Sequence, residues 1–83
     1  MVSEIIIPNF GANIEEGEII EWYVNKGDMV YLGDPLFCFE TTKGTFDVEA
    51  EQDGMLLKIL YTDGFHNNLT VIGYIGDEGD DIP

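Results

Sequence analysis

Short runs of β-branched and aromatic residues, separated by glycine-containing turns, constrain the fold of this 83-residue chain most strongly. The turns recur at roughly 8 to 12 residues, a spacing typical of all-β sandwiches and barrels, and no helical periodicity is sustained. The sequence predicts strands near Glu4–Ile7, Glu18–Val24, Met29–Tyr31, Pro35–Thr41, Thr45–Ala50, Gly54–Leu60, Leu69–Val71 and Ile72–Gly76. We therefore expect an all-β fold.

An internal repeat appears when the sequence is shifted by 37 residues against itself. The shift places Gly17–Trp22 over Gly54–Ile59. It also places Gly27 over Gly64, and after one deletion Leu36–Phe39 falls over Ile72–Ile75. Such a repeat indicates two similar sheets that are related by an approximate twofold axis.

The charge of the chain is strongly negative. Seventeen acidic residues face three basic ones, Lys26, Lys43 and Lys58, which gives a formal net charge of −14 at pH 7. A chain this acidic repels phosphate backbones and anionic lipid surfaces, so nucleic-acid and membrane partners are not expected. The charge either forms a solvated surface or steers the chain towards a basic partner enzyme.

Nucleophilic and metal-binding side chains are scarce, since Cys38, His66 and Ser3 are the only residues of their kinds. A single cysteine forms no internal disulfide, and one histidine provides no cluster for a structural metal. No Ser-His-Asp or Cys-His arrangement is available, so we do not expect the chain to be an enzyme by itself. Ser3 stands beside an extended segment rather than a helix, which excludes a phosphopantetheine carrier.

The length suits one small domain. We assign residues 1–76 to this domain and the acidic, glycine-rich residues 77–83 to the start of a flexible linker or tail. No run approaches the roughly 20 apolar residues of a membrane span, and no signal-peptide pattern precedes the first strand. We expect a cytoplasmic location, or the mitochondrial matrix if the domain is organellar.

Lys43 lies at the junction of the two repeats, in the stretch Phe39–Val48. Residues on either side alternate with period two, and Lys43-Gly44 is the only position where the chain can reverse, which predicts a hairpin with Lys43 at its exposed tip. An ordinary turn lysine is a solvated residue and a poor nucleophile. An amide-linked cofactor, in contrast, would gain reach from a rigid base of this kind.

Nearly the whole chain resembles the lipoyl domains of 2-oxo acid dehydrogenase acyltransferases. The features that carry this resemblance follow one another in the family's order: Pro8, Gly11, Ile14–Ile19, Trp22–Val30, Gly33-Asp34, Leu36, Glu40–Gly44, Asp47-Val48, Gly54, Gly64 and the tail from Ile75 to Ile82. The resemblance implies a flattened β-barrel, or barrel-sandwich hybrid, of two four-stranded antiparallel sheets with quasi-twofold symmetry. It also implies that lipoate is joined to Lys43.

The same resemblance implies a carrier function. The lipoyl group would act as a swinging arm that is acylated by a thiamine-dependent 2-oxo acid decarboxylase and delivers the acyl group to coenzyme A at the acyltransferase core. Dihydrolipoamide dehydrogenase would then reoxidise it. The domain itself would be monomeric and non-catalytic, and would supply position, mobility and recognition.

Two segments depart from the family pattern. Thr42-Lys43-Gly44 stands where lipoyl domains usually have Asp-Lys-Ala, and Phe65–Thr70 replaces the usual Val-Pro-Val-Gly stretch. We expect Glu40, Thr42, Gly44 and Asp47 to shape recognition by the lipoyl-attaching enzyme. For Glu40 and Asp47, a solvated strand face is the alternative.

Three further features carry expectations. The loop Asn9–Ile14 is expected beside the modified lysine, where it helps the decarboxylase to choose its domain, or else its Phe10 covers the core. Trp22 is expected to pack on the face shared by Ile20 and Val24. Cys38 is expected to point outwards, where we expect an inert thiol and a reactive one is the alternative.

Two alternatives to a lipoyl carrier remain. Biotin is the runner-up cofactor, in a biotinyl carrier domain of a carboxylase. Such domains resemble this barrel but usually place their lysine between methionines, and Met29 and Met55 are far from Lys43 in sequence. The other alternative is an unmodified barrel used for protein interaction.

Overall fold

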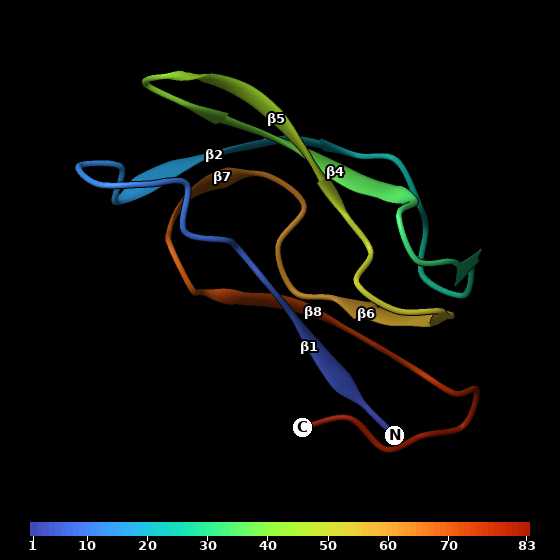
Figure 1. Cartoon of the computed structure of the whole chain (residues 1–83). Coiled ribbons are helices and arrows are strands. Elements are labelled where there is room, and N and C mark those ends of the chain that lie inside the picture. Colours follow the sequence, from blue (N-terminus) through green and yellow to red (C-terminus); the bar gives the residue numbers. More distant parts are fainter.

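The computed structural model describes residues 1–83 and contains eight strands and no helix (Figure 1). The strands are β1 (Ser3–Ile6), β2 (Glu16–Trp22), β3 (Met29–Val30), β4 (Pro35–Thr41), β5 (Gly44–Glu49), β6 (Gly54–Ile59), β7 (Gly64–Asn67) and β8 (Val71–Gly76). The structure has no helix long and apolar enough to span a membrane.

The strands form two four-stranded antiparallel sheets, with strand orders β1-β8-β6-β3 and β5-β4-β2-β7. Moving every strand four places along the chain, and returning to β1 after β8, converts one order into the other. The predicted quasi-twofold arrangement is therefore confirmed. The sheets lie face to face in an elongated sandwich of 38 × 22 × 19 Å that is not closed into a continuous barrel.

Gly17 and Gly54, one of the two glycine pairs that align in the sequence repeat, occupy equivalent places. A Cβ at Gly17 would lie less than 3.0 Å from the Glu40 carbonyl oxygen and the Phe39 ring. A Cβ at Gly54 would lie 3.1 Å from the Gly76 carbonyl oxygen and also 3.1 Å from Ile75. Each glycine thus lets its strand approach the neighbouring strand at corresponding positions.

The core fills the space between the sheets. Its largest fully buried side chains are Phe37, Phe39, Ile7, Ile19, Leu36, Leu56, Ile72 and Val30. Trp22 packs against this core, with its ring centroid 4.9 Å from that of Phe37, and its indole N–H donates a hydrogen bond of 2.9 Å to the Tyr61 carbonyl oxygen. The packing role expected for Trp22 is confirmed.

Ile20 does not share the face of Trp22, contrary to expectation. The pairing of β2 with β4 shifts register between Ile19 and Glu21, which is a bulge that leaves Ile20 as the extra residue. Ile19 is buried, whereas Ile20 is 46% exposed. One inserted residue moves a side chain to the opposite face, so simple alternation fails at this point.

The strand predicted at Leu69–Val71 is wrong, because the strand in this region lies earlier in the chain. The strand before β8 is β7, which pairs with the first half of β2, and Leu69 lies in the turn that follows it. Leu69 has a φ of 67° and is 63% exposed. The prediction favoured the apolar Leu69 over the more polar segment Gly64–Asn67, which is the segment that forms the strand.

Cys38 was expected to be an outward-facing thiol, but it is buried. It does face outwards on β4, where its partners are Glu21 on β2 and Asp47 on β5. Tyr23, which follows β2, reaches across β4 and donates a hydrogen bond of 2.7 Å to the Asp47 carboxylate. Its ring therefore shields Cys38 from solvent.

Candidate functional site

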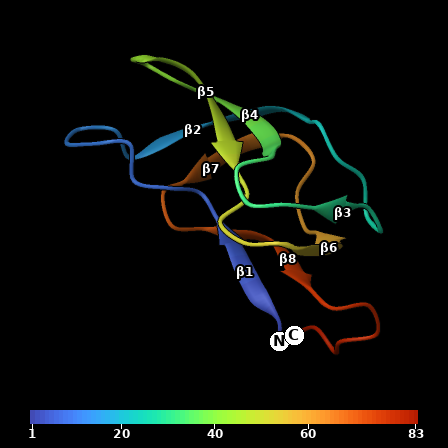
Figure 2. The same ribbon diagram turned by 45° about the vertical axis from the view of Figure 1, so that its right-hand side comes forward.

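The β4–β5 hairpin projects from one end of the molecule, and both termini lie together at the other end (Figures 1 and 2). Thr41 and Gly44 form the last strand pair, so Thr42 and Lys43 make a two-residue turn. The chain reverses one residue earlier than predicted, because Gly44 opens β5 instead of completing the turn. Its φ of 141° lies in the region that favours glycine.

Thr41 holds the base of this turn. It is the one buried polar residue of the chain, with 9% exposure, and sequence reasoning did not include it in the site. Its hydroxyl accepts a hydrogen bond of 3.1 Å from the Lys43 backbone N–H and donates one of 3.4 Å to the Gly44 carbonyl oxygen. The inward alternation of Phe37, Phe39 and Thr41 was the signal that could have identified it.

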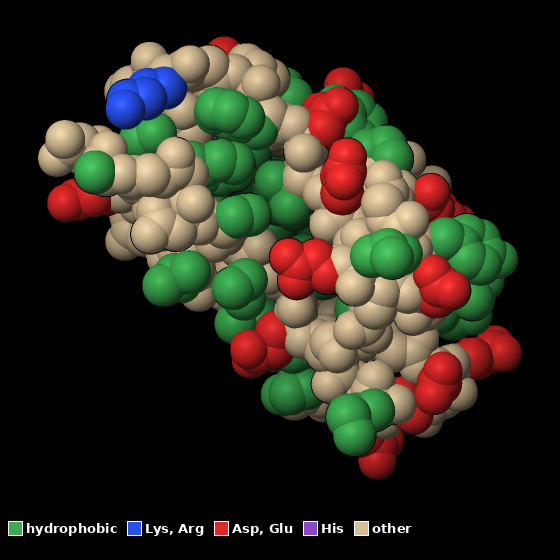
Figure 3. All heavy atoms as spheres, in the orientation of Figure 1, with side chains coloured by type: hydrophobic (Ala, Val, Ile, Leu, Met, Phe, Trp, Pro, Cys, Tyr) green, Lys and Arg blue, Asp and Glu red, His purple; other side chains and the backbone are tan.

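Lys43 is exposed at the tip, as predicted. Both ion pairs of the structure involve the Met1 ammonium group, so the Lys43 amine is not held by a carboxylate. Figure 3 shows a basic side chain at the end where the hairpin tip lies and acidic side chains along the rest of that face. The other lysines lie elsewhere, Lys58 within β6 and Lys26 in the β2–β3 connection.

The tip fits an amide-linked carboxylic acid cofactor. The attachment chemistry needs a primary amine that is free of a competing ion pair, and Lys43 provides one. Thr42, the other turn residue, is also exposed, and no atom lies within 4 Å of a Cβ built on Gly44. An enzyme can therefore approach this backbone closely.

Glu40 and Asp47 are exposed on the outer face of the hairpin sheet, away from the core. Glu40 lies opposite Thr45 and nearer the tip, whereas Asp47 lies opposite Cys38. The hydrogen bond from Tyr23 occupies one Asp47 oxygen, and this bond, followed by the contact with Cys38, raises the pKa of Tyr23 above its ordinary value of 10.0. The two carboxylates thus share a face but differ in their surroundings.

The β1–β2 loop lies at the same end of the molecule as the hairpin tip (Figures 1 and 2). Phe10 stacks on Phe46 of β5 and on Phe39 of β4, with ring centroids 4.7 Å and 5.6 Å apart. It also packs against the buried core. The loop is therefore attached to the inner side of the hairpin, and Phe10 covers the core there.

Part of the segment that departs from the family pattern anchors this loop. The Asn68 backbone N–H donates a hydrogen bond of 2.9 Å to the Glu15 carbonyl oxygen, and its side-chain amide donates another to the Ile14 carbonyl oxygen. Phe65, in contrast, is 69% exposed on the edge strand β7, opposite Glu18. The segment thus supports the end of the molecule that carries the tip.

The chain matches known proteins over most of its length. A biotin/lipoyl family model, described as biotin-requiring enzyme, matches residues 3–67. The pyruvate dehydrogenase complex protein X component of Chaetomium thermophilum, a mitochondrial protein, is 40% identical over 93% of this chain. The dihydrolipoyllysine-residue acetyltransferase component of the pyruvate dehydrogenase complex of Rhizobium meliloti is 35% identical over 99%.

A third relative belongs to another complex. The dihydrolipoyllysine-residue succinyltransferase component of the 2-oxoglutarate dehydrogenase complex of Rickettsia felis is 41% identical over 77% of this chain. The matched regions make up 18%, 19% and 16% of these three relatives, so the chain spans less than a fifth of their length. The chain belongs to the biotin/lipoyl attachment family, and its lipoyl-domain resemblance to components of 2-oxo acid dehydrogenase complexes is confirmed.

Proposed function

We propose that this chain is a lipoyl carrier domain that bears lipoate in amide linkage on Lys43. The observation that carries the proposal is an exposed lysine without an ion pair on a two-residue turn, in a chain of the biotin/lipoyl family. Attached lipoate would supply a dithiolane that can be reduced and acylated. The chain itself would act as a non-catalytic support.

In this proposal, the hairpin holds the cofactor and the opposite end of the molecule carries the linker. The β4–β5 ladder and the Thr41 hydroxyl hold the backbone of Lys43, so the side chain and its cofactor swing from a fixed base. Residues 1–76 form the domain in this proposal, and residues 77–83 begin a linker at the far end from the tip. A tether placed there leaves the tip free to enter several active sites.

The proposed partners are a lipoyl-attaching enzyme and the enzymes of a 2-oxo acid dehydrogenase complex. These are a thiamine-dependent decarboxylase, an acyltransferase core and dihydrolipoamide dehydrogenase, which fits relatives in pyruvate and 2-oxoglutarate dehydrogenase complexes. A bacterial cytoplasm or the mitochondrial matrix would be the compartment. The β1–β2 loop, next to the hairpin, is the proposed contact for the decarboxylase.

Glu40, Thr42, Gly44 and Asp47 are the proposed recognition residues for the attaching enzyme. Thr42 and Gly44 adjoin Lys43, and neither has a side chain that blocks access to the amine. Glu40 supplies an exposed carboxylate near the tip. Asp47 contributes as a carboxylate that is already held by Tyr23, and its role is the more structural of the two.

Lipoate is favoured over biotin by the names of the relatives and by the place of the methionines. Met29 pairs with Met55 between β3 and β6, in the sheet that does not contain the hairpin. Neither methionine therefore flanks Lys43. An unmodified barrel for protein interaction is the remaining alternative.

Intact-mass measurement tests the proposal. The chain is expressed with a lipoyl-attaching enzyme and lipoate, and in parallel with a biotin ligase and biotin. We expect a lipoyl-sized mass gain for the parent, none for Lys43→Arg, and a full gain for the matched controls Lys26→Arg and Lys58→Arg. A biotin-sized gain would reassign the cofactor. No gain in either arm would support the unmodified barrel, or a dedicated ligase that requires Thr42 and Gly44.

A further inference from the structure

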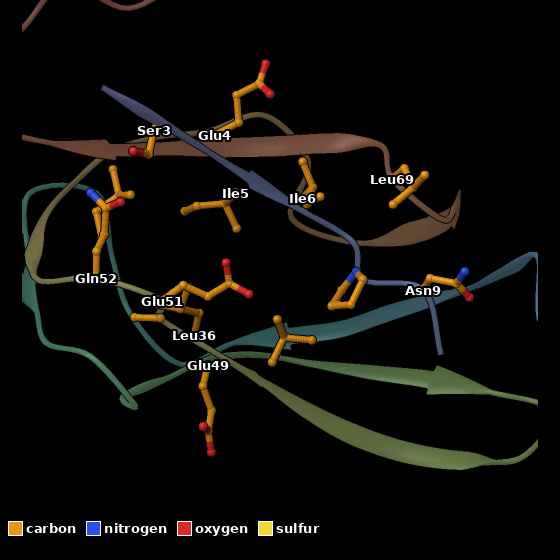
Figure 4. A pocket seen from close by; sticks show the side chains of 14 residues that line it. Ser3, Glu4, Ile5, Ile6, Asn9, Leu36, Glu49, Glu51, Gln52 and Leu69 are labelled. Atoms are coloured by element: carbon orange, nitrogen blue, oxygen red, sulfur yellow. The ribbon is translucent and has the colours of Figure 1, made fainter. Parts of the chain in front are cut away.

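A groove of about 360 Å³ opens along one side of the sandwich, between the edge strands β1 and β5 (Figure 4). These strands pair with β8 and β4 respectively, and they do not pair with each other. The groove floor includes Ile5, Leu36 and Ile75, which are all at least nine-tenths buried. The groove thus has an apolar floor, and two strand edges without a partner strand form its rims.

One carboxylate points into this groove. In Figure 4, Glu51 reaches into the space between Ile5 and Leu36, whereas the carboxylates of Glu4 and Glu49 point away from it. No basic side chain lines the groove, and neither ion pair of the structure involves Glu51. An apolar floor with one unpaired carboxylate matches a side chain that is aliphatic along its stem and cationic at its end.

The backbone that carries Glu51 is held in place. The neighbouring residue Ala50 is buried, donates a hydrogen bond of 2.8 Å to Asp34 and accepts one of 2.9 Å from Gly33. On the other side, the Asp53 carboxylate accepts a hydrogen bond of 2.8 Å from the Leu32 backbone N–H. The groove is therefore formed before any partner arrives, which lowers the entropic cost of binding.

We propose that this groove binds an extended segment of a partner protein through a Lys or Arg side chain. The stem of that side chain lies on Ile5, Leu36 and Ile75, and its cation meets the Glu51 carboxylate. The backbone of the segment lies along the β1 and β5 edges, as in strand addition. A second copy of this chain does not suit the groove, since each copy carries a net charge of −14.

The proposal is independent of modification at Lys43, and a short peptide tests it. The probe is a blocked five-residue peptide with a central lysine between valines, titrated at roughly millimolar concentration into the isotope-labelled 83-residue chain. We expect the backbone amide signals of residues along the groove floor to shift, and the shifts to reach a plateau as peptide is added. Glu51→Gln should weaken binding about tenfold, because a charge-assisted hydrogen bond is lost.

Glu49→Gln is the matched control, since it removes the same charge from the same edge but from a carboxylate that points away. It should leave the dissociation constant within about twofold of the parent value. A peptide with norleucine in place of the central lysine should bind the parent chain about as weakly as the lysine peptide binds Glu51→Gln. Lys43→Arg should bind like the parent, which keeps this test separate from that of the carrier function.

Three outcomes would overturn the proposal. In the first, the amide signals of the groove residues would not shift when the peptide is added. In the second, Glu49→Gln would weaken binding as much as Glu51→Gln, which would indicate a general effect of charge. In the third outcome, the shifts at the groove depend on the concentration of the chain without peptide, which indicates self-association.

Discussion

The Thr41 hydroxyl is the polar group on which the shape of the hairpin tip most depends, since it bonds to the backbone of both Lys43 and Gly44. Thr41→Val keeps the volume and removes both hydrogen bonds. We expect a loss of about 1 kcal/mol in the free energy of unfolding, because solvent can partly replace these bonds at the tip. Urea unfolding followed by Trp22 fluorescence measures this loss.

Thr42→Val is the control for Thr41→Val. Thr42 is exposed, and the side-chain hydrogen bonds at the turn are made by Thr41, so the change should stay within about 0.5 kcal/mol. Thr41→Ser should restore most of the parent stability and the parent rate of lipoylation. Equal losses for the Thr41→Val and Thr42→Val variants would show that the hydroxyl of Thr41 has no special role.

Tyr23 carries a prediction about pH. The hydrogen bond to the Asp47 carboxylate raises the pKa of Tyr23 above 10.0, so the folded chain keeps this phenol protonated where the unfolded chain has lost the proton. The stabilisation is complete below the unfolded pKa of about 10 and is lost as pH rises above it towards the folded value. Above about pH 10, the free energy of unfolding should therefore fall less steeply with pH in Tyr23→Phe than in the parent.

Phenolate absorbance measures this shift directly. The titration curve of the parent minus that of Tyr23→Phe isolates Tyr23 among the four tyrosines. We expect its midpoint well above 10, and a return towards 10 in Asp47→Asn, because the amide carries no charge. A difference curve centred near 10 in the parent would contradict the hydrogen bond.

The Tyr23 bridge also explains why alternation alone misjudged Cys38. Period two correctly indicates that Cys38 faces away from the core residues Phe37 and Phe39. It does not indicate that Tyr23, just after the neighbouring strand β2, lies across the outer face. Exposure depends on side chains that are remote in sequence, and such contacts are not encoded in the local pattern.

At the element scale, the hairpin was the best-predicted part of the site. The period-two alternation before and after Lys43 predicted β4, β5 and the exposed tip. For Glu40 and Asp47, the solvated strand face was only the alternative to a role in recognition, and both residues are exposed on the outer face. The turn was predicted at Lys43-Gly44 but lies at Thr42-Lys43. A glycine inside a two-residue turn and a glycine just after it give similar sequences, so the pattern does not fix the position.

The misplaced seventh strand shows what local propensity leaves out. His66 and Asn67 are weak strand formers, and β7 exists because it adds to the edge of β2. The 37-residue shift places Met29–Tyr31 over His66–Asn68, so the repeat itself indicated a strand there. A long-range regularity was thus more reliable than residue preferences at this position.

The repeat glycines provide a matched pair of substitutions. Gly17→Ala should cost about 3 kcal/mol of unfolding free energy, because the new methyl group overlaps the Glu40 carbonyl oxygen and the Phe39 ring. Gly54→Ala should cost about 1 kcal/mol, since the contacts at 3.1 Å require only a small shift. Chemical denaturation compares the two, and a larger loss for Gly54→Ala would contradict the packing at Gly17.

At the scale of the whole molecule, the twofold arrangement is broken where function is proposed. The turn after β4 carries Thr42-Lys43, whereas the region after β8, its counterpart, is the acidic turn Asp77–Asp80. There the Met1 ammonium group lies 3.3 Å from Asp77 and 3.1 Å from Asp80. One end of the sandwich therefore presents the exposed Lys43 amine, and at the other end the N-terminal ammonium group is paired with the turn after β8.

The excess of acidic residues acts on the whole molecule as self-repulsion. With a net charge of −14 and two ion pairs, compaction brings like charges together, and added salt screens them. We expect the melting temperature to rise by roughly 4–8 °C between about 10 mM and about 200 mM NaCl, which corresponds to about 1 kcal/mol for a domain of this size.

A variant with fewer charges tests the cause of this salt effect. Glu16→Gln, Glu21→Gln and Glu78→Gln together remove three exposed carboxylates and change the net charge from −14 to −11. The combined variant should melt higher than the parent at low salt and respond less to NaCl, because less repulsion remains to be screened. A melting temperature that falls with salt in the parent would instead show that attractive pairs, such as those of Met1, dominate its electrostatics.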